Sequence, residues 1–216
     1  MSVTESRIAL VTGATRGIGL ETVRQLAQAG VHTLLAGRNR DRAVEAALKL
    51  QADGLPVEAI ALDVTDAASI AAAAETIEDR HGRLDILVNN AGIVVDDAQL
   101  GVAGQLLDTW RTTFETNVFG LIATTQALLP LLHKSQAGRI VNVSSLLGSI
   151  SEHQNPDSFI YDFKGLPAYN VSKSAVNAWT VHLAHALKDS GIKVNTINPG
   201  YVRTDMNKVG DEQSGE

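Results

Sequence analysis

Six short apolar runs alternate with longer stretches of helical character, and this alternation constrains the fold more than any other feature. The runs are rich in Val, Ile and Leu and are bounded by Gly, Asn or Asp, as buried strands usually are: residues 7–12, 31–36, 57–62, 84–89, 139–144 and 192–198. Helical candidates occupy residues 17–29, 40–53, 66–80, 105–133 and 168–190. Alternating strands and helices predict parallel strands joined by right-handed crossovers. We therefore expect an α/β fold with a doubly wound parallel sheet.

Composition narrows the class of protein further. The chain has 216 residues, enough for one domain with a substantial core. Its net charge of −6 argues against nucleic acid as the main partner, because neutralising phosphates needs a basic surface. The chain has no cysteine, which fits a reducing compartment. No apolar stretch approaches the ~20 residues of a membrane-spanning helix, and the polar start leaves no room for a signal peptide. We expect a cytoplasmic protein with no membrane partner.

A glycine-rich turn follows the first predicted strand and opens the first predicted helix. Its three glycines allow a sharp turn and let backbone N–H groups approach a phosphate, and the last glycine also allows close helix–strand packing. The positive end of the following helix favours an anion at the same place. The turn lacks the Lys-Ser/Thr pair of nucleotide-hydrolysing loops. We expect it to bind the pyrophosphate of a dinucleotide through Gly13, Thr15, Arg16, Gly17, Ile18 and Gly19.

The end of the second predicted strand indicates which dinucleotide would bind. NAD-binding proteins of this architecture usually carry a carboxylate there, which accepts hydrogen bonds from the adenosine ribose. Here Gly37 occupies that position and Arg38 follows it. A guanidinium binds a 2′-phosphate that a carboxylate would repel, and Arg16 lies in the neighbouring turn. The alternative is that both arginines are solvated surface residues. Their joint placement favours NADP(H) as the cofactor.

Tyr169 and Lys173 stand four residues apart in a helical pattern that follows the fifth predicted strand. This spacing puts both side chains on one helical face. An ammonium within ~4–6 Å would lower the pKa of a phenol, ordinarily ~10, by ~1–3 units. The phenol could then donate or accept a proton near neutral pH. The pair also falls beyond the carboxyl ends of the strands, where active sites of open α/β sheets lie.

Two other groups of titratable residues are set aside. His182 and His185 share a helical face, but no motif supplies a third ligand, so no metal site is predicted. Asp96 and Asp97 are adjacent, and neighbouring side chains usually splay apart, so we interpret them as loop charge.

Together these motifs resemble the short-chain dehydrogenase/reductase family over roughly residues 7–207. The family writes its cofactor turn T-G-x-x-x-G-x-G and its catalytic pair Y-x-x-x-K, and both occur here in that order. The resemblance implies a Rossmann fold. It also implies further cofactor-binding residues, which are Asp63 and Val64 after the third strand, Asn90, Ala91 and Gly92 in an N-N-A-G motif, and Pro199, Gly200 and Thr204 after the sixth strand.

The same resemblance implies a serine and an asparagine in the site. Ser145 matches the family's catalytic serine, with Ser144 as the second choice, and Asn117 matches its asparagine. Ser145 would hold the substrate oxygen while Tyr169 delivers the proton. Lys173, besides its effect on the phenol, would bind the nicotinamide ribose. Asn117 would hold a water molecule in the proton path.

The predicted function is an NADP(H)-dependent oxidoreductase that interconverts a ketone or aldehyde with an alcohol. One alternative is a catalytically silent NADP(H)-binding sensor or scaffold, although the intact catalytic set speaks against it. Another is an epimerase or dehydratase on the same scaffold, which would convert its substrate without net consumption of NADPH.

The chain departs from the family in two regions. Residues 150–167 form a long connection that holds Phe159, Tyr161 and Phe163 and, like residues 203–206, resembles the carbonyl-reductase-like branch. This loop is either pinned to the surface by an aromatic plug or covers the substrate, which we expect to be of moderate size with apolar flanks. The family's usual last helix and strand are missing, so we expect the sixth strand to be an exposed edge.

The organisation follows from these features. We expect one domain over residues 1–208 and a disordered acidic tail over residues 209–216. Helices 105–133 and 168–190 offer a candidate homodimer face.

Overall fold

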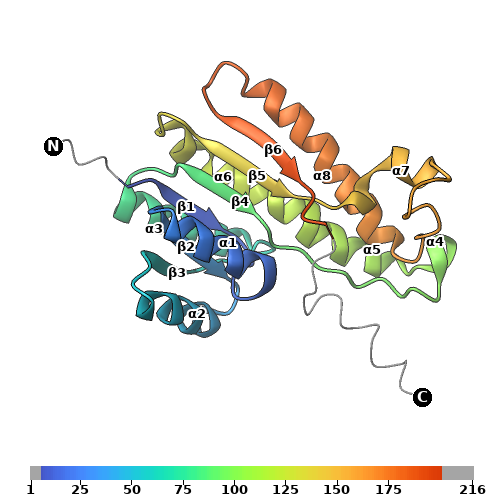
Figure 1. Cartoon of the computed structure of the whole chain (residues 1–216), viewed down its shortest axis with the longest axis horizontal. Coiled ribbons are helices and arrows are strands. Elements are labelled where there is room, and N and C mark those ends of the chain that lie inside the picture. The colour runs from blue at the N-terminus through green and yellow to red at the C-terminus, as the bar shows by residue number, and fades with distance from the viewer. Residues whose placement is uncertain (1–5, 201–216) are drawn as a thin grey trace.

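A computed structural model describes residues 6–200, which form a parallel sheet between two layers of helices (Figure 1). The strands are β1 (Ile8–Val11), β2 (His32–Gly37), β3 (Val57–Ala61), β4 (Ile86–Asn89), β5 (Arg139–Val143) and β6 (Lys193–Ile197). They lie in the order β3-β2-β1-β4-β5-β6, and every neighbouring pair is parallel. The direction of winding therefore reverses between β1 and β4, which creates a crevice at their carboxyl ends. The predicted doubly wound α/β sheet is confirmed.

The helices follow the predicted pattern, with one interruption. They are α1 (Gly17–Gln28), α2 (Arg40–Ala52), α3 (Ala67–His81), α4 (Gly101–Gly104), α5 (Leu107–Phe114), α6 (Leu121–His133), α7 (Ile150–Gln154) and α8 (Pro167–Ala186). The prediction of a single helix over residues 105–133 is wrong, because a π-helical segment, η1 (Glu115–Gly120), separates α5 from α6. Such wide turns are frequent at functional sites. A short 3₁₀ turn, η2 (Leu146–Gly148), follows β5.

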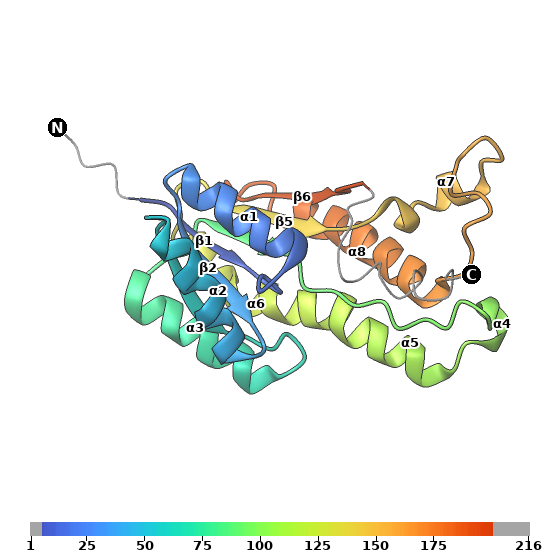
Figure 2. The ribbon, with the colours of Figure 1, turned by 60° about the horizontal axis from the view of Figure 1, so that its bottom comes forward.

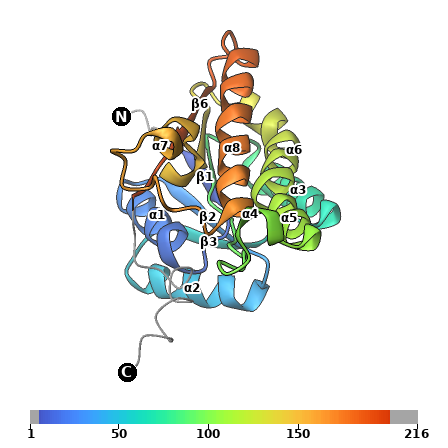
Figure 3. The same ribbon diagram turned by 90° about the vertical axis from the view of Figure 1, so that its right-hand side faces the viewer.

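Alternate residues of the strands face the two helical layers, which the views from other sides show on opposite sides of the sheet (Figures 2 and 3). On one side, helices α3 and α6 cover Leu10, Leu34, Leu87 and Ile140. On the other side, helices α1 and α2 cover Val11, Leu35, Val88 and Val143. Burial on both faces explains why the strands read as continuous apolar runs in the sequence.

A buried polar network ties the central strands to the helices. The Asn89 amide donates to Thr125 Oγ1 on α6 and to the Asn142 amide oxygen on β5, both at 2.9 Å. Asn142 in turn donates to Thr180 Oγ1 on α8 at 2.8 Å. All four side chains are buried. Because buried polar groups must find partners, this chain of hydrogen bonds fixes how α6 and α8 sit on the sheet.

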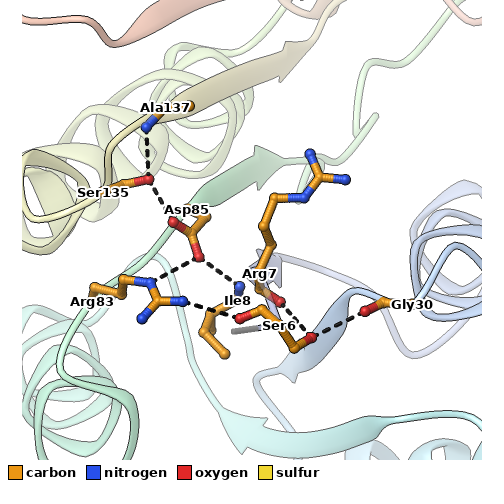
Figure 4. Close-up of polar contacts among 8 residues, drawn as sticks. All are labelled: Ser6, Arg7, Ile8, Gly30, Arg83, Asp85, Ser135 and Ala137. Atoms are coloured by element: carbon orange, nitrogen blue, oxygen red, sulfur yellow. Dashed lines mark hydrogen bonds and ion pairs between the residues drawn. The ribbon is translucent and has the colours of Figure 1, made fainter. Parts of the chain in front are cut away.

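A second polar centre lies at the opposite end of the strands, around Asp85 (Figure 4). Its carboxylate accepts hydrogen bonds from the Ile8 N–H, the Arg83 guanidinium and the Ser135 hydroxyl. Burial acts to raise the pKa of Asp85, but the Ser135 and Ile8 hydrogen bonds and the Arg83 charge outweigh it, so the pKa lies below its ordinary value. Asp85 thus joins the start of β1 to β4 and to the turn before β5.

Replacing Asp85 by Asn should lower the free energy of unfolding at pH 7 by about 1.5–3 kcal/mol, because charge-assisted hydrogen bonds to buried donors are lost. A carboxyl whose pKa is depressed by folding stabilises the fold above its unfolded pKa of ~3.9, and this contribution disappears as pH falls through the folded pKa. The difference between the two proteins should therefore persist at pH 4 and shrink only as the pH falls below about 3. Urea unfolding at pH 7, at pH 4 and at about pH 2.5 measures it. The exposed Asp79→Asn change is the matched control, and an equal effect there would contradict the assignment.

Some predictions fall outside the described part of the chain. Residues 203–206, including Thr204, and the acidic tail at 209–216 are among them. Within residues 6–200, β6 pairs with β5 alone and forms one edge of the sheet. In the same part, no helix combines the length and the apolar character that crossing a bilayer requires.

Candidate active site

The glycine-rich turn occupies the crevice between β1 and β4. Gly13 and Gly17 have φ angles of +62° and +57°, a conformation that favours glycine. A Cβ on Gly13 would also lie 2.8 Å from the Ala91 Cα, and one on Gly19 would lie 2.5 Å from the side-chain nitrogen Nδ2 of Asn90. Gly13 and Gly19 are therefore required by close contacts, and Gly17 by its backbone conformation. The start of α1, where the preceding residue provides no side-chain cap, suits a phosphate.

Hydrogen bonds lock this turn to the loop after β4. The Asn90 amide donates to the carbonyl oxygens of Thr12 and Gly13, at 2.9 and 3.1 Å. In return, Thr12 Oγ1 accepts from the N–H groups of Asn90 and Ala91, both at 3.0 Å. Sequence reasoning did not assign Thr12 to the site, although it directly precedes the first glycine of the motif. Gly92 follows in the chain, and a Cβ on it would lie 3.4 Å from Asn117 Oδ1 and 3.6 Å from Lys173 Nζ.

Basic side chains line a hollow of ≈ 390 Å³ beside the turn. Arg16 and Arg38, the two predicted residues, both line it, together with Arg24 and Arg42, while Lys49 is paired there with Glu45 at 2.7 Å. Gly37 lies at the base of this region, where a Cβ would approach the Thr15 methyl group to 2.5 Å. The glycine thus leaves room for Thr15 at the position where a carboxylate was expected in NAD-binding proteins. These features fit a dinucleotide that carries an additional phosphate on its adenosine ribose.

Asp63 and Val64 follow β3 at the edge of the crevice. Asp63 accepts hydrogen bonds from the N–H and hydroxyl of Thr65, at 2.9 and 2.7 Å. These bonds, together with the Arg38 charge, hold the pKa of Asp63 below its ordinary value. Val64 is buried, and its carbonyl oxygen approaches Gly120 of η1 so closely that a Cβ there would lie at 2.6 Å. The carboxylate of Asp63 therefore remains charged beside the hollow.

Ser145 and Tyr169 meet beyond the carboxyl end of β5. Ser145 caps η2 by accepting the Leu147 N–H at 3.2 Å, and its hydroxyl lies near enough to the Tyr169 phenol to lower the pKa of that group. Ser144 is buried instead and points towards the Lys173 carbonyl oxygen at 3.5 Å. Of the two serines, Ser145 is therefore the one that faces the tyrosine. The close packing of η2 on α8, where a Cβ on Gly148 would lie 2.7 Å from the Lys173 carbonyl carbon, holds this arrangement.

Lys173 lies on the same face of α8, directly behind the tyrosine. Its ammonium is 5.6 Å from the centre of the Tyr169 ring and donates to the Val143 carbonyl oxygen at 2.8 Å. The side chain is buried, and this burial lowers the pKa of Lys173 to about 8. The expected lowering of the tyrosine pKa is wrong for this structure. Burial raises the pKa of Tyr169, and the Ser145 hydrogen bond only partly opposes it.

Asn117 sits in the π-helical segment η1 and is completely buried. Its amide oxygen accepts the Ile93 N–H at 2.8 Å, and its nitrogen donates to the Ile93 carbonyl and to Ser172 Oγ, both at 3.0 Å. Ser172 Oγ then donates to the Tyr169 carbonyl. Both donors of the amide thus brace the loop after β4 against α8, so the predicted water molecule could bind this side chain only by donating to the amide oxygen.

Asp96 has a role that the sequence interpretation missed. Its carboxylate accepts the backbone N–H groups of Ala168 and Tyr169, at 2.6 and 3.2 Å. These are orphan donors at the start of α8, whose own first residues provide no side-chain cap. The interpretation of Asp96 as loop charge is therefore wrong, because it caps the helix at the residue that carries the phenol. A carboxylate at this end of a helix is also favoured by the helix dipole.

The long loop between Ser145 and Tyr169 is not pinned by its aromatic residues. Phe159 is 87% exposed, and Tyr161 and Phe163 are also exposed, whereas the buried side chain is Ile160 at 3%. The aromatic-plug interpretation is therefore wrong. The loop lies at the same end of the molecule as α4 (Figures 1 and 2). After β6, Gly200 has a φ of +74° and donates its N–H to the Asn198 side chain, so Pro199 and Gly200 form a turn.

Comparisons with known proteins agree with this geometry. The model of the short chain dehydrogenase family matches residues 7–215. Short-chain dehydrogenase/reductase 1 of Saponaria officinalis is 37% identical, over 94% of this chain and 84% of its own. The 3-oxoacyl-(acyl-carrier-protein) reductase of Vibrio harveyi is 34% identical, over 95% and 77%. A crystal structure of an actinorhodin polyketide ketoreductase variant with NADPH superposes with a TM-score of 0.84 at 30% identity, covering 100% of this chain and 80% of that one. The chain therefore belongs to the short-chain dehydrogenase/reductase family of oxidoreductases, whose members bind a nicotinamide cofactor.

Proposed function

We propose that this protein is an NADP(H)-dependent oxidoreductase that interconverts a ketone or aldehyde with the corresponding alcohol. The observation that carries the proposal is the meeting of Ser145, Tyr169 and Lys173 beyond β5, beside the glycine turn after β1. Relatives named as a 3-oxoacyl reductase and a polyketide ketoreductase, one of them with NADPH, support the same reaction class.

The cofactor would lie across the crevice between β1 and β4. The turn from Gly13 to Gly19 would bind its pyrophosphate, and the basic hollow around Arg16 and Arg38 would bind the 2′-phosphate. Asp63, Val64 and the Asn90–Gly92 loop would line the adenosine side, and Pro199, Gly200 and Thr204 the nicotinamide side. When bound, the cofactor supplies or accepts the hydride.

The chain's own residues would handle the substrate oxygen and its proton. Negative charge grows on that oxygen during reduction, and the Ser145 hydroxyl would hydrogen-bond to it. The Tyr169 hydroxyl would then give it a proton. The Lys173 ammonium would stabilise the resulting phenolate, and because its pKa is about 8 it can return a proton to Tyr169 near neutral pH.

Exposed apolar side chains on the long loop and at the start of α5 support a substrate with apolar flanks. Phe159 and Phe163 of the long loop are exposed, and so are Leu106 and Leu107 near the start of α5. Exposed apolar patches of this kind commonly mark ligand or partner sites. We infer that the loop over residues 150–167 covers the substrate.

A homodimer through the two long helical segments also belongs to the proposal. Phe119 on η1 and Val171 and Val181 on α8 are all exposed large apolar side chains, with exposures of 55%, 46% and 69%. A second copy of the chain would bury them.

The decisive experiment follows NADPH absorbance while the protein is supplied with a panel of ketones and aldehydes. We expect oxidation of NADPH with at least one carbonyl compound, in proportion to the alcohol formed. Tight binding of NADPH without oxidation would contradict the proposal and favour a sensor. Conversion of substrate without net loss of NADPH would contradict it in favour of an epimerase or dehydratase.

A further inference from the structure

Three potential metal ligands meet at the end of the sheet opposite the candidate active site. His32 is the first residue of β2, Glu58 lies near the start of β3, and His81 is the last residue of α3. The two imidazole rings are 5.1 Å apart. Each Nε2 atom faces the same carboxylate oxygen, Glu58 Oε2, at 3.5 Å from His32 and 3.3 Å from His81. Within the described residues, these form a group whose ligand atoms all lie within 4.8 Å of one another.

The two imidazole nitrogens do not meet the geometry of a hydrogen bond, although each lies within ion-pair distance of Glu58 Oε2. Both His32 Nε2 and His81 Nε2 are buried from solvent, and neither makes a hydrogen bond within the described part of the chain. Buried polar atoms are nearly always satisfied, so two such atoms aimed at one point require an explanation. A cation between them would satisfy both at once.

The spacing fits a tetrahedral ion. Ligand atoms bound at about 2.0–2.1 Å around a tetrahedral centre lie roughly 3.3–3.4 Å apart. The two nitrogen–oxygen distances are close to this value, and the two nitrogens lie within 4.8 Å of each other, so a small movement of one ring brings all three ligands to it. Imidazole nitrogens with one carboxylate suit Zn²⁺ and its neighbours among the first-row metals, whereas Mg²⁺ and Ca²⁺ prefer sites built from oxygen alone. Three protein ligands leave a fourth position for water.

The second oxygen of Glu58 explains how the carboxylate is held. Arg80 binds Glu58 Oε1, which leaves Oε2 directed towards the imidazoles. Such outer contacts commonly orient metal-binding carboxylates. The Arg80 side chain is 58% exposed, so it can move towards solvent when a second positive charge arrives.

We propose that His32, Glu58 and His81 bind a divalent ion of the zinc class, which joins β2, β3 and the end of α3. The site lies at the amino ends of the strands, away from Tyr169 and the glycine turn at their carboxyl ends. Its role is therefore structural: the ion stabilises the folded chain and takes no part in turnover. Sequence spacing could not reveal the site, because the three ligands come from distant segments of the chain.

Calorimetric titration of the untagged, chelator-treated full chain with Zn²⁺ at pH 7.5 tests the proposal. We expect one site per chain with a dissociation constant of about 1 μM or below, and a rise in melting temperature with Zn²⁺ concentration. His81→Gln should weaken binding at least 100-fold, whereas His185→Gln, at an exposed position on α8, should leave it unchanged. Equal Zn²⁺ affinity in the parent and His81→Gln proteins, or the absence of a micromolar site in the parent, would overturn the proposal.

A second measurement does not depend on the folding of the His81 variant. Co²⁺ should give the intense visible absorption of a four-coordinate ion when added to the His182→Gln/His185→Gln double variant, which keeps the proposed ligands. Zn²⁺ should abolish this absorption, because it competes with Co²⁺ for the same ligands. If the protein gives no more than the weak absorption of hydrated, six-coordinate Co²⁺, the proposed site is contradicted.

Discussion

Replacing Arg38 by Asp is expected to raise the KM for NADPH by about 10²-fold while changing the KM for NADH by no more than about twofold. The guanidinium lines the basic hollow at the end of β2, and the charge-assisted bonds that we propose it makes to a 2′-phosphate would be worth about 1.5–3 kcal/mol. The new carboxylate adds repulsion to that loss. NADH has no 2′-phosphate and should not respond to either effect.

Steady-state kinetics with both cofactors and one carbonyl substrate measures this change. Arg40→Asp provides the matched control, because Arg40 is exposed at the start of α2 and does not line the hollow. A similar rise for NADPH and NADH in the Arg38 variant would show that the hollow does not select the 2′-phosphate.

Much of the fold follows from local patterns in the sequence. The strands are continuous apolar runs because helices bury them on both faces. The spacing of the glycines from Gly13 to Gly19 can be recognised within a few residues of sequence, without information about distant contacts. Tyr169 and Lys173 share a helical face by spacing alone. These features are local, so the sequence predicts them directly.

The missed features depend on contacts between distant segments. Asp96 caps α8 at Ala168 and Tyr169, which lie 72 and 73 residues away in the chain. The π-helical segment interrupts a run that reads as one continuous helix. Neither is encoded by periodicity.

The pKa of the tyrosine is a further example. Spacing places Lys173 near Tyr169, but the direction of the pKa shift depends on burial, which only the packed structure reveals. Burial raises the pKa of the phenol and lowers that of the ammonium. The uncharged form of each group is therefore favoured more than it would be in water. A bound substrate and cofactor would add their own charges to this balance.

Tyr169→Phe removes one hydroxyl and is expected to lower kcat for carbonyl reduction by about 10²–10⁴-fold, the usual contribution of a positioned general acid. The phenol is the only proton donor that we assign to the substrate oxygen, since Ser145 serves to hold it. Phenylalanine keeps the aromatic ring beside Lys173, so the fold and the binding of NADPH should be unchanged. Fluorescence titration with NADPH provides that control, with a dissociation constant within about twofold of the parent.

The proton-donor role of Tyr169 is tested most directly by comparing the parent and Tyr169→Phe proteins at saturating NADPH, with the carbonyl compound that the parent reduces fastest. We expect equal NADPH binding and a loss of NADPH absorbance about 100-fold slower or more in the variant. Turnover at the parental rate by a variant that binds NADPH equally well would contradict that role, because the proton would then reach the substrate without the phenol on α8.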